Sequence, residues 1–231
     1  MPARNSIKQY LEGGYYHVYN RGVEKRNIFL DQQDYAVFLS YLREYLTPKN
    51  HLELYQKISE RDISPLEKDK YIKQLNRNNF FEEVQLLAYS LLPNHFHFLL
   101  KQKNATSMDK FMNSIGTRYT MYFNKKYERV GRLYQDVYKA VLVLTDEQLL
   151  HLSRYIHRQA IFLQGDPLQN LQKTHSSYPE YIASRNTPWI SRNEILSFFS
   201  KEMPALTYES FVKQQDDFNQ IAGLILESTG R

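Results

Sequence analysis

The chain has 231 residues, a formal net charge of +5 and no cysteine, which excludes disulfide bonds, thiolate catalysis and cysteine-ligated zinc. Hydrophobic residues make up 42% of the sequence and aromatic residues 14%, enough to bury the core of one domain with an appendage or of two small domains. The first residues, MPARNSIKQY, lack the apolar stretch of a signal peptide, and no apolar run approaches membrane-spanning length. We therefore expect a cytoplasmic protein with no membrane partner.

The positive charge lies in the first part of the chain. Residues 1–163 carry 24 Lys and Arg against 17 Asp and Glu, whereas residues 164–231 carry 6 against 8. Within the first part, residues 101–139 hold nine basic and three acidic side chains, interleaved with tyrosines. Such a segment can supply phosphate contacts and stacking surfaces for single-stranded bases, although a solvated helix face with buried aromatics would have the same composition.

The first 80 residues contain a predicted strand and a predicted helix. Residues 14–20, GYYHVYN, alternate as in a strand and end at the turn-like Asn20-Arg21-Gly22. Asp31 can cap a helix whose apolar residues recur at helical spacing until Thr47-Pro48. Residues 48–80 are polar and irregular apart from a helix near Pro65 to Leu75, and we interpret them as an insertion.

The next 80 residues predict a hairpin, two helices and one more strand. Residues 84–92 and 95–102 flank the turn pair Pro93-Asn94. Thr106 or Ser107 can begin a long helix that ends before Gly131, and residues 133–143 alternate enough to form a strand. Thr145 and Gln148 have the spacing of a capping box for a helix that runs to about Leu163.

This order of elements favours an α+β fold. It lacks the regular alternation of a parallel doubly wound sheet and fits a ferredoxin-like, RRM-like antiparallel sheet with helices on one face. Gly165-Asp166-Pro167 marks a boundary, which divides the chain into a core at residues 1–164 and a helical C-terminal extension at residues 165–231. In the extension, Ser191 with Glu194 caps a first helix that Pro204 ends, and residues 207–227 form a second.

Two histidines stand one residue apart in the second strand of the hairpin. Because residues i and i+2 of a strand share a face, His95 and His97 point side by side, an arrangement that suits a metal. A metal site needs at least a third protein ligand, and no further histidine has a suitable local spacing. The last core helix offers Tyr155 and Gln159, which are four residues apart and therefore share a face.

These motifs resemble those of a known family. His95-Phe96-His97 has the form of the HUH motif, His-hydrophobic-His, and residues 155–159, YIHRQ, resemble the Tyr-x-x-x-Gln helix motif of the single-tyrosine HUH transposases. That family includes insertion-sequence transposases and the REP-associated tyrosine transposases. The stretches YHVYNRGVEKRNIFLDQQDY, AYSLLPNHFHFLL, YTMYFNKKYERVGRLYQDVYKA and HSSYPEY are similar to the family pattern in the same order, so that the resemblance covers roughly residues 14–182.

The resemblance implies a metal-dependent transesterase that cleaves and rejoins single-stranded DNA near hairpins. His95, His97 and Gln159 would hold one divalent ion, Mg²⁺ or Mn²⁺, and Tyr155 would attack the scissile phosphate to leave a 5′-phosphotyrosine and a 3′-hydroxyl. A monomer or a homodimer acting on prokaryotic nucleoid DNA, without a nucleotide cofactor, would fit this activity. We predict DNA contacts at nine basic residues, namely Arg21, Lys110, Arg118, Lys125, Lys126, Arg129, Arg132, Arg154 and Arg158.

Three alternatives stay open at this point. Tyr119 or Tyr122 could be the nucleophile, although both fall on an apolar stripe that core packing explains better. The chain could be a domesticated, catalytically silent module that binds single-stranded nucleic acid. It could also be a metal-dependent hydrolase that uses water as the nucleophile. The remaining histidines, His17, His51, His151, His157 and His175, are expected to be exposed polar residues.

Overall fold

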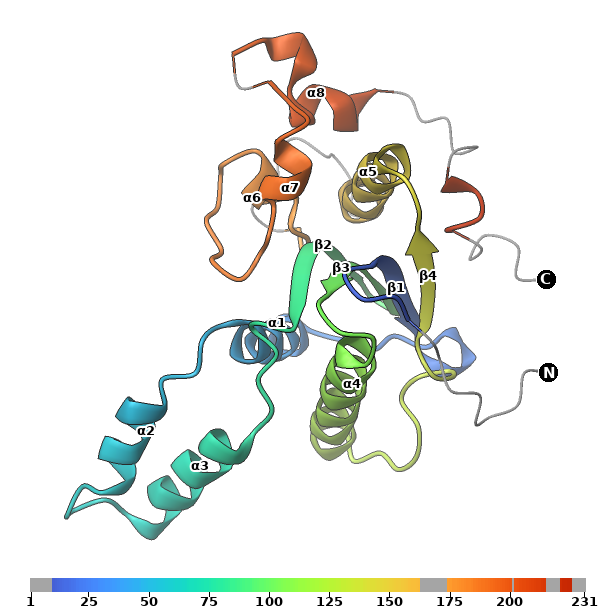
Figure 1. Ribbon diagram of the computed structural model, residues 1–231. Helices are drawn as coiled ribbons and strands as arrows, with labels where there is room; N and C mark the ends of the chain where they lie inside the picture. Colours follow the sequence, from blue (N-terminus) through green and yellow to red (C-terminus); the bar gives the residue numbers. More distant parts are fainter. Residues whose placement is uncertain (1–9, 163–173, 201, 215–220, 226–231) are drawn as a thin grey trace.

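A four-stranded antiparallel sheet forms the centre of the molecule. The computed structural model describes residues 10–162, 174–200, 202–214 and 221–225 (Figure 1). The strands are β1 (Tyr15–Arg21), β2 (Val84–Leu92), β3 (His95–Gln102) and β4 (Lys139–Val143), in the order β2-β3-β1-β4. Helices separate β1 from β2 and β3 from β4, and with this strand order they confirm the predicted ferredoxin-like α+β class.

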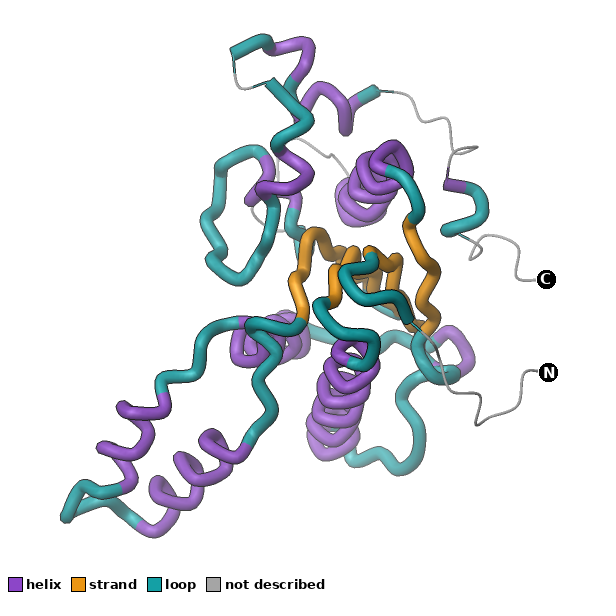
Figure 2. The backbone as a smooth tube through the Cα atoms, viewed as in Figure 1, coloured by secondary structure: helices purple, strands orange, loops and turns teal. Residues whose placement is uncertain are grey.

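Helices cover both faces of the sheet. Helices α1 (Gln32–Leu46) and α4 (Ser107–Lys126) lie on one face, whereas α5 (Asp146–Phe162) lies on the other (Figures 1 and 2). On the first face, Phe38 of α1 contacts Phe96 of β3 and Tyr119 of α4, with ring centroids 5.7 and 4.9 Å apart. The sequence predicted helices on one face; α1 and α4 share a face, whereas the tyrosine-bearing helix α5 covers the other.

Burial on both faces explains the sequence of the hairpin. Residues 86–92 of β2 and residues 96–100 of β3 are all buried, so these strands read as apolar runs and not as an alternation. The two residues between them form the turn as predicted. The helix starts also follow the sequence, because Asp31 accepts a hydrogen bond from the amide of Asp34 at 3.0 Å and Thr145 accepts one from the amide of Gln148 at 3.1 Å.

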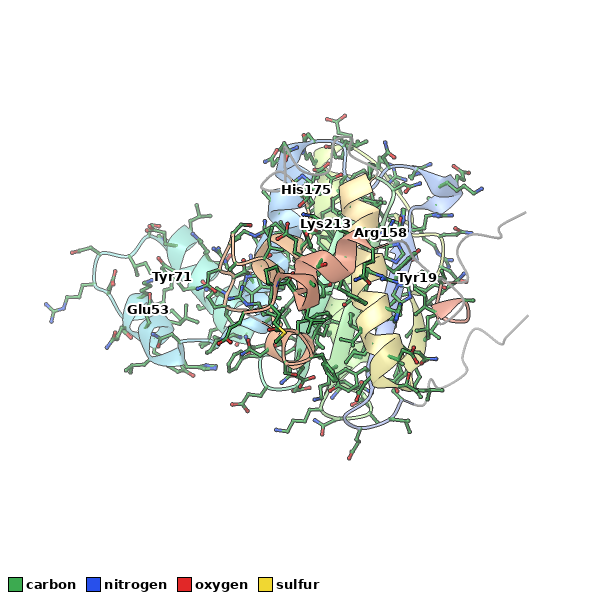
Figure 3. The ribbon with its side chains drawn as sticks, turned by 90° about the horizontal axis from the view of Figure 1, so that it is seen from above. Tyr19, Glu53, Tyr71, Arg158, His175 and Lys213 are labelled. Carbon is green, nitrogen blue, oxygen red and sulfur yellow. The ribbon has the colours of Figure 1, made fainter. Side chains whose placement is uncertain are left out.

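The predicted insertion is a helical arm. Helices α2 (His51–Ile58) and α3 (Pro65–Asn76) lie side by side and project from the body (Figure 1). Glu53 and Tyr71 belong to this arm, which lies on the side of the molecule away from Tyr19 (Figure 3). A capping box between Ser64 and Glu67 starts α3 as the sequence indicates. The expectation of irregular structure before α3 was wrong, because Asn50 caps α2 through its side chain.

The predicted fourth strand is shorter than expected. Only Lys139–Val143 pair with β1, whereas residues 133–138 form a loop. This loop is still tied to the strand end, because the amide of Gln135 donates to the carbonyl of Arg21 at 2.8 Å and Tyr134 bridges Gly22. A short 3-10 turn, η1 (Val23–Lys25), follows β1 at the same place.

The C-terminal extension packs along the free edge of β2. Its elements are α6 (Tyr178–Tyr181), α7 (Asn193–Leu196), η3 (Pro204–Leu206) and α8 (Tyr208–Lys213). The amide of Leu91 donates to the carbonyl of His175 at 2.8 Å, and the amide of Ser191 donates to the carbonyl of Leu86 at 2.9 Å. These bonds cover backbone groups that an edge strand would otherwise expose.

Two predictions for the extension were wrong. Residue 192, not Ser191, is the N-cap of α7, and this helix is only four residues long. The second helix ends at Lys213, so residues 207–227 do not form one helix. The boundary predicted at residues 165–167 lies outside the described residues.

Candidate active site

The strand pairing gathers polar side chains on the face of the sheet that α5 covers. In the β1–β3 register, Tyr19 is opposite His97 and Arg21 is opposite His95. Paired residues of antiparallel strands share a face, and His17 lies on that face as well because it is two residues from Tyr19. Phe96 and Phe98 point to the other face, toward α1 and α4. The predicted orientation of the histidine pair is therefore confirmed.

His97 lies at the centre of this group and is fully buried. Its ring centroid is 5.0 Å from that of His95, 5.1 Å from that of His17 and 6.0 Å from that of Tyr19. Nδ1 of His97 is 2.9 Å from Nε2 of His17, and Nδ1 of His17 is 2.7 Å from the carbonyl oxygen of Leu224. The group thus joins two strands of the core to the C-terminal segment.

Tyr155 reaches the same group from α5. Its ring meets that of His97 edge-on with centroids 5.6 Å apart, and that of His17 edge-on at 6.1 Å. Tyr155 is 8% exposed and therefore buried at the interface between α5 and the sheet. Gln159 is one helical turn further along α5 and is half-buried. The structure therefore brings Tyr155 to the histidine pair, as the sequence predicts.

Burial keeps these imidazoles neutral. Desolvation, reinforced by the nearby Arg21 guanidinium, lowers the pKa of His95 from 6.5 to about 4. Desolvation together with the neighbouring His17 and His95 lowers the pKa of His97 well below 6.5. Near neutral pH both rings are uncharged, which is the form that binds a metal ion. Among the described residues no set of three or more His, Asp or Glu is arranged to hold an ion.

Helix α5 is anchored by a buried hydrogen-bond network on its side toward the extension. Nδ1 of His157 is 2.7 Å from the hydroxyl of Tyr208 in α8, and Nε2 is 2.7 Å from the hydroxyl of Ser177. The Tyr208 hydroxyl also donates to Ser153 at 3.1 Å. The expectation of an exposed His157 was wrong: the side chain is fully buried and joins α5 to the extension.

This network predicts that the protein loses stability in mild acid. Burial lowers the pKa of His157 from 6.5 to about 3, so between these values the unfolded chain binds a proton that the folded chain does not. The contribution of His157 to the free energy of unfolding should be level above pH 7 and should fall by about 1.4 kcal/mol per pH unit below pH 6.5. Urea unfolding at a series of pH values gives the slope of unfolding free energy against pH. This slope should be smaller by the equivalent of one proton in His157→Gln, whereas His51→Gln, which changes an exposed residue, should match the wild type. An unchanged slope in His157→Gln would contradict this origin.

The nine predicted DNA contacts fall into different environments. Arg21 lies at the end of β1 beside His95, and its buried Nε has no hydrogen-bond partner among the described residues. Lys110, Lys125 and Arg132 are exposed, the first two on α4 behind the sheet. The other five hold the fold together through carboxylates, carbonyls, amides or aromatic rings, and they are Arg118, Lys126, Arg129, Arg154 and Arg158.

Two examples show why charge alone does not mark a contact surface. Lys126 forms ion pairs with Asp31 at 2.7 Å and with the fully buried Asp34 at 2.8 Å. Arg118 pairs with Glu44 at 2.7 Å while its guanidinium stacks over Tyr41, 3.7 Å from the ring centroid. Both side chains are committed to α1, so we expect them to contribute little to a DNA surface.

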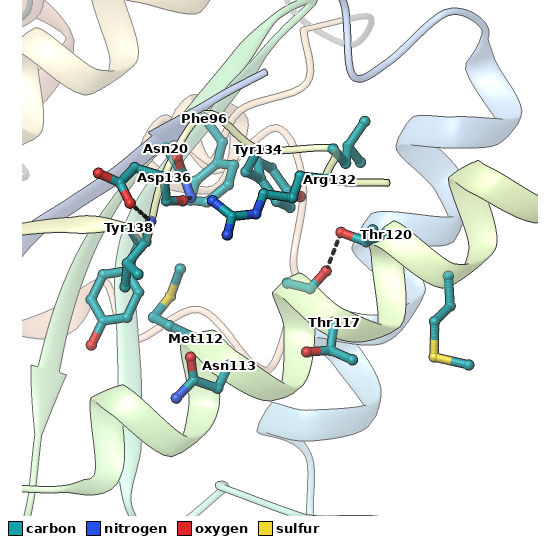
Figure 4. Close-up of a pocket in the computed structure, with 14 residues that line it drawn as sticks. Asn20, Phe96, Met112, Asn113, Thr117, Thr120, Arg132, Tyr134, Asp136 and Tyr138 are labelled. Atoms are coloured by element: carbon teal, nitrogen blue, oxygen red, sulfur yellow. Dashed lines mark hydrogen bonds between the residues drawn. The ribbon is translucent and has the colours of Figure 1, made fainter. Parts of the chain in front are cut away.

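A cavity of about 540 Å³ opens between α4 and the loop at residues 131–138 (Figure 4). Arg132, Asn113 and Thr117 line it together with Phe96 and Asn20. Asn20 and Arg21 are successive residues of β1 and therefore face opposite sides of the sheet. The cavity thus lies behind the same end of the sheet that carries Arg21 and His95 on its front.

The predictions from the sequence missed two side chains that lie on this face of the sheet. His17 was expected to be exposed but is fully buried and hydrogen-bonded to His97. Lys139 of β4 is opposite Tyr19, with its Nζ 5.7 Å from the Tyr19 ring centroid. The alternation of GYYHVYN puts His17 on one face with Tyr19 and Arg21, which is the signal that could have identified it.

A family model matches the segment of the chain that contains the candidate site. The family model described as "Transposase IS200 like" matches residues 65–159, a segment that contains His95, His97, Tyr155 and Gln159. This match confirms the resemblance to single-tyrosine transposases for the part of the chain that carries the site. His17 lies outside the matched residues. A search of curated proteins found no match.

Two solved structures were also found. One is a REP-associated tyrosine transposase bound to a REP hairpin, 12% identical, with a TM-score of 0.48 and coverage of 83% of this chain and 92% of that one. The other is a protein from Deinococcus radiodurans R1, provisionally described as a transposase, 14% identical, with a TM-score of 0.27 and coverage of 67% and 97%.

In the described part of the chain, no helix has the length and hydropathy needed to cross a bilayer.

Proposed function

We propose that this protein is a transposase that cleaves and rejoins single-stranded DNA beside hairpins, with Tyr155 as the nucleophile and a divalent ion held by His95, His97 and Gln159. The observation that carries the proposal is the edge-on contact between the rings of Tyr155 and His97, 5.6 Å apart, across the interface of α5 and the sheet. It brings the nucleophile of one element to the metal-binding pair of another. The match of this segment to a transposase family supports DNA as the substrate.

The side chains at the site can carry out a transesterification in which one phosphoester bond forms as another breaks. The hydroxyl oxygen of Tyr155 forms a bond to the scissile phosphorus and loses its proton, while the bond from phosphorus to the 3′ oxygen breaks and that oxygen leaves as a hydroxyl. The 5′ phosphate stays on the tyrosine. Attack by another 3′-hydroxyl reverses the step, so rejoining needs no nucleotide cofactor.

The histidine pair fits a divalent ion. Nδ2 of Asn94 donates to the carbonyl of Lys25 at 3.2 Å, which turns Oδ1 toward His95, and Nδ1 of His95 donates to that oxygen at 2.6 Å. With its proton on Nδ1, neutral His95 presents Nε2 as a ligand. A bound Mg²⁺ or Mn²⁺ would stabilise negative charge on the phosphate oxygens during the attack.

In this proposal Arg21 and Lys139 would contact the scissile phosphate. Both lie on the face of the sheet that carries His97, and Arg21 is opposite His95. The Arg21 guanidinium, whose buried Nε has no hydrogen-bond partner in the described part of the chain, can donate to a phosphate oxygen beside the histidine pair. The basic residues of α4 lie on the other face and would contact only the flanking DNA.

A covalent adduct tests the proposed function. The wild-type protein, a divalent ion and a hairpin-flanked single strand labelled on the 3′ side of the cut should give labelled protein that survives denaturation. The same strand labelled on the 5′ side should release labelled DNA with a 3′-hydroxyl. Cleavage without any adduct would favour a hydrolase, and binding without cleavage would favour a silent nucleic-acid-binding module.

The exposed lysines of α4 are expected to contribute to DNA affinity without a role in the chemistry. Charge reversal in Lys110→Glu with Lys125→Glu should weaken binding to unrelated single strands to a similar extent. If both lysines contact phosphates, the plot of log affinity against log salt should become shallower by about 0.7 for each contact. Lys68→Glu on the arm is the matched control. An unchanged salt slope would show that the α4 lysines are merely solvated.

A further inference from the structure

A chain of ring nitrogens and one carbonyl connects the C-terminal segment to His97. The carbonyl oxygen of Leu224 is 2.7 Å from Nδ1 of His17, and Nε2 of His17 is 2.9 Å from Nδ1 of His97. Leu224 and Ile221 are both buried, so this carbonyl is held in place by packing of the segment at residues 221–225. Neither His17 nor Leu224 lies in the matched family segment.

The Leu224 carbonyl determines where the protons lie in this series of hydrogen bonds. A carbonyl oxygen can only accept, so Nδ1 of His17 carries a proton and donates it to Leu224. A second proton on His17 would place a cation in a fully buried site between a carbonyl and an imidazole, which is costly. Nε2 of His17 is therefore an acceptor, and Nδ1 of His97 must be the donor of the hydrogen bond between the two rings.

We infer that His17 is a positioning residue that holds His97 in the tautomer protonated on Nδ1 and so presents Nε2 of His97 to the metal ion. The inference rests on the proposed function for the identity of the ligand, but the tautomer itself is a property of the metal-free protein. His17 does for His97 what Asn94 does for His95, because each orients its ring through Nδ1. Metal-binding histidines commonly need such a partner on the second nitrogen.

The arrangement gives the C-terminal segment a part in the chemistry. A neutral imidazole can carry its proton on either nitrogen. Among the described residues, it is the bond to the Leu224 carbonyl that keeps the proton of His17 on Nδ1. The core motif of two histidines and a tyrosine is therefore completed by residues more than 60 positions beyond Tyr155. The stacking of the His17 and His97 rings, with planes 16° apart, keeps their nitrogens in line.

Nitrogen NMR of the metal-free protein measures the tautomer directly. Long-range ¹H–¹⁵N spectra should show His97 with a protonated Nδ1 and an unprotonated Nε2. His17→Phe keeps an aromatic ring but removes both hydrogen bonds, so His97 should shift toward the other tautomer. His17→Gln can donate to Leu224 through its amide nitrogen and accept from His97 through its oxygen, so it should restore the wild-type spectrum.

Metal affinity supplies the second readout. Titration with Mn²⁺ followed by electron paramagnetic resonance should show binding about 10- to 100-fold weaker in His17→Phe and close to wild type in His17→Gln. Phe38→Leu, on the opposite face of the sheet, controls for lost core packing and should change neither the tautomer nor the affinity.

The outcomes separate this inference from the proposed function. A wild-type His97 protonated on Nε2, or a His17→Phe protein with an unchanged tautomer or unchanged Mn²⁺ affinity, would overturn the role of His17. Wild-type protein that shows the expected tautomer but binds no Mn²⁺ would overturn the proposed metal site and still support the action of His17 on His97.

Discussion

Tyr155→Phe is expected to abolish the covalent protein–DNA adduct and to leave DNA binding intact. Phenylalanine keeps the ring that meets His97 edge-on at 5.6 Å and His17 at 6.1 Å, so the packing of α5 on the sheet should survive. Only the attacking oxygen is removed, and we expect strand cleavage to fall by about 10⁴-fold or more. Denaturing gels with DNA labelled on the 3′ side of the cut measure the adduct, and fluorescence anisotropy measures the binding.

Two other tyrosines are matched controls. The Tyr119 hydroxyl donates to the carbonyl of Ile28 at 2.6 Å, and the Tyr122 hydroxyl donates to Asp34 at 3.0 Å. Both belong to α4, on the face of the sheet opposite α5, and burial raises the pKa of Tyr122 to about 12, which disfavours its phenolate near neutral pH. Tyr119→Phe and Tyr122→Phe should still form the adduct. An adduct in Tyr155→Phe, or one that mass spectrometry maps to another tyrosine, would refute the assignment.

The parts of the site that the sequence predicts are those that depend on local periodicity. A strand places His95 and His97 on one face whatever surrounds it, and a helix places Tyr155 and Gln159 on one face in the same way. The turn at Pro93-Asn94 then sets the register of the hairpin, and its strand bounds are those the sequence indicates. Local spacing cannot say which face of the sheet α5 will cover.

The parts that the sequence does not predict depend on partners far along the chain. His17 is 80 residues from His97 and 207 residues from Leu224, so the local alternation can place it on a face with Tyr19 and Arg21 but cannot show that this face is buried. The same holds for Lys126, whose partners Asp31 and Asp34 belong to α1. A basic composition could not separate that lysine from the exposed Lys125, because only tertiary packing decides which charges meet a carboxylate.

The extension shows the same limit in its backbone. A helix over residues 207–227 agrees with the local composition, yet α8 ends at Lys213. Tyr208 and Phe211 of this helix pack against α5, where Arg154 lies over the Phe211 ring and His157 bonds to Tyr208. Tertiary contacts of this kind routinely override local helix propensity.

Replacement of His95 and His97 by alanine is expected to abolish metal-dependent cleavage while much of the single-strand affinity remains. The two imidazoles are neutral near pH 7, because burial lowers the pKa of each, and without them Gln159 is the one proposed ligand left. The basic residues that contact DNA phosphates are unchanged in this variant. Cleavage with and without Mg²⁺ or Mn²⁺, and after removal of the ion by a chelator, measures the effect.

The two single variants show whether lost activity reflects lost ligands or lost folding. His97→Ala opens a cavity in a fully buried site and leaves Nε2 of His17 without its partner, which should cost about 1–3 kcal/mol of unfolding free energy. His95→Ala changes a half-buried residue at the start of β3 and should unfold much like the wild type. Because His95 is a proposed ligand, its loss should still reduce cleavage at low metal concentration, with partial recovery as the metal concentration is raised.

His51→Ala on the arm is the control and should bind metal and cleave normally. Metal-dependent cleavage that persists unchanged in the double variant would end the assignment of these histidines as ligands, since no loss of folding could then be invoked.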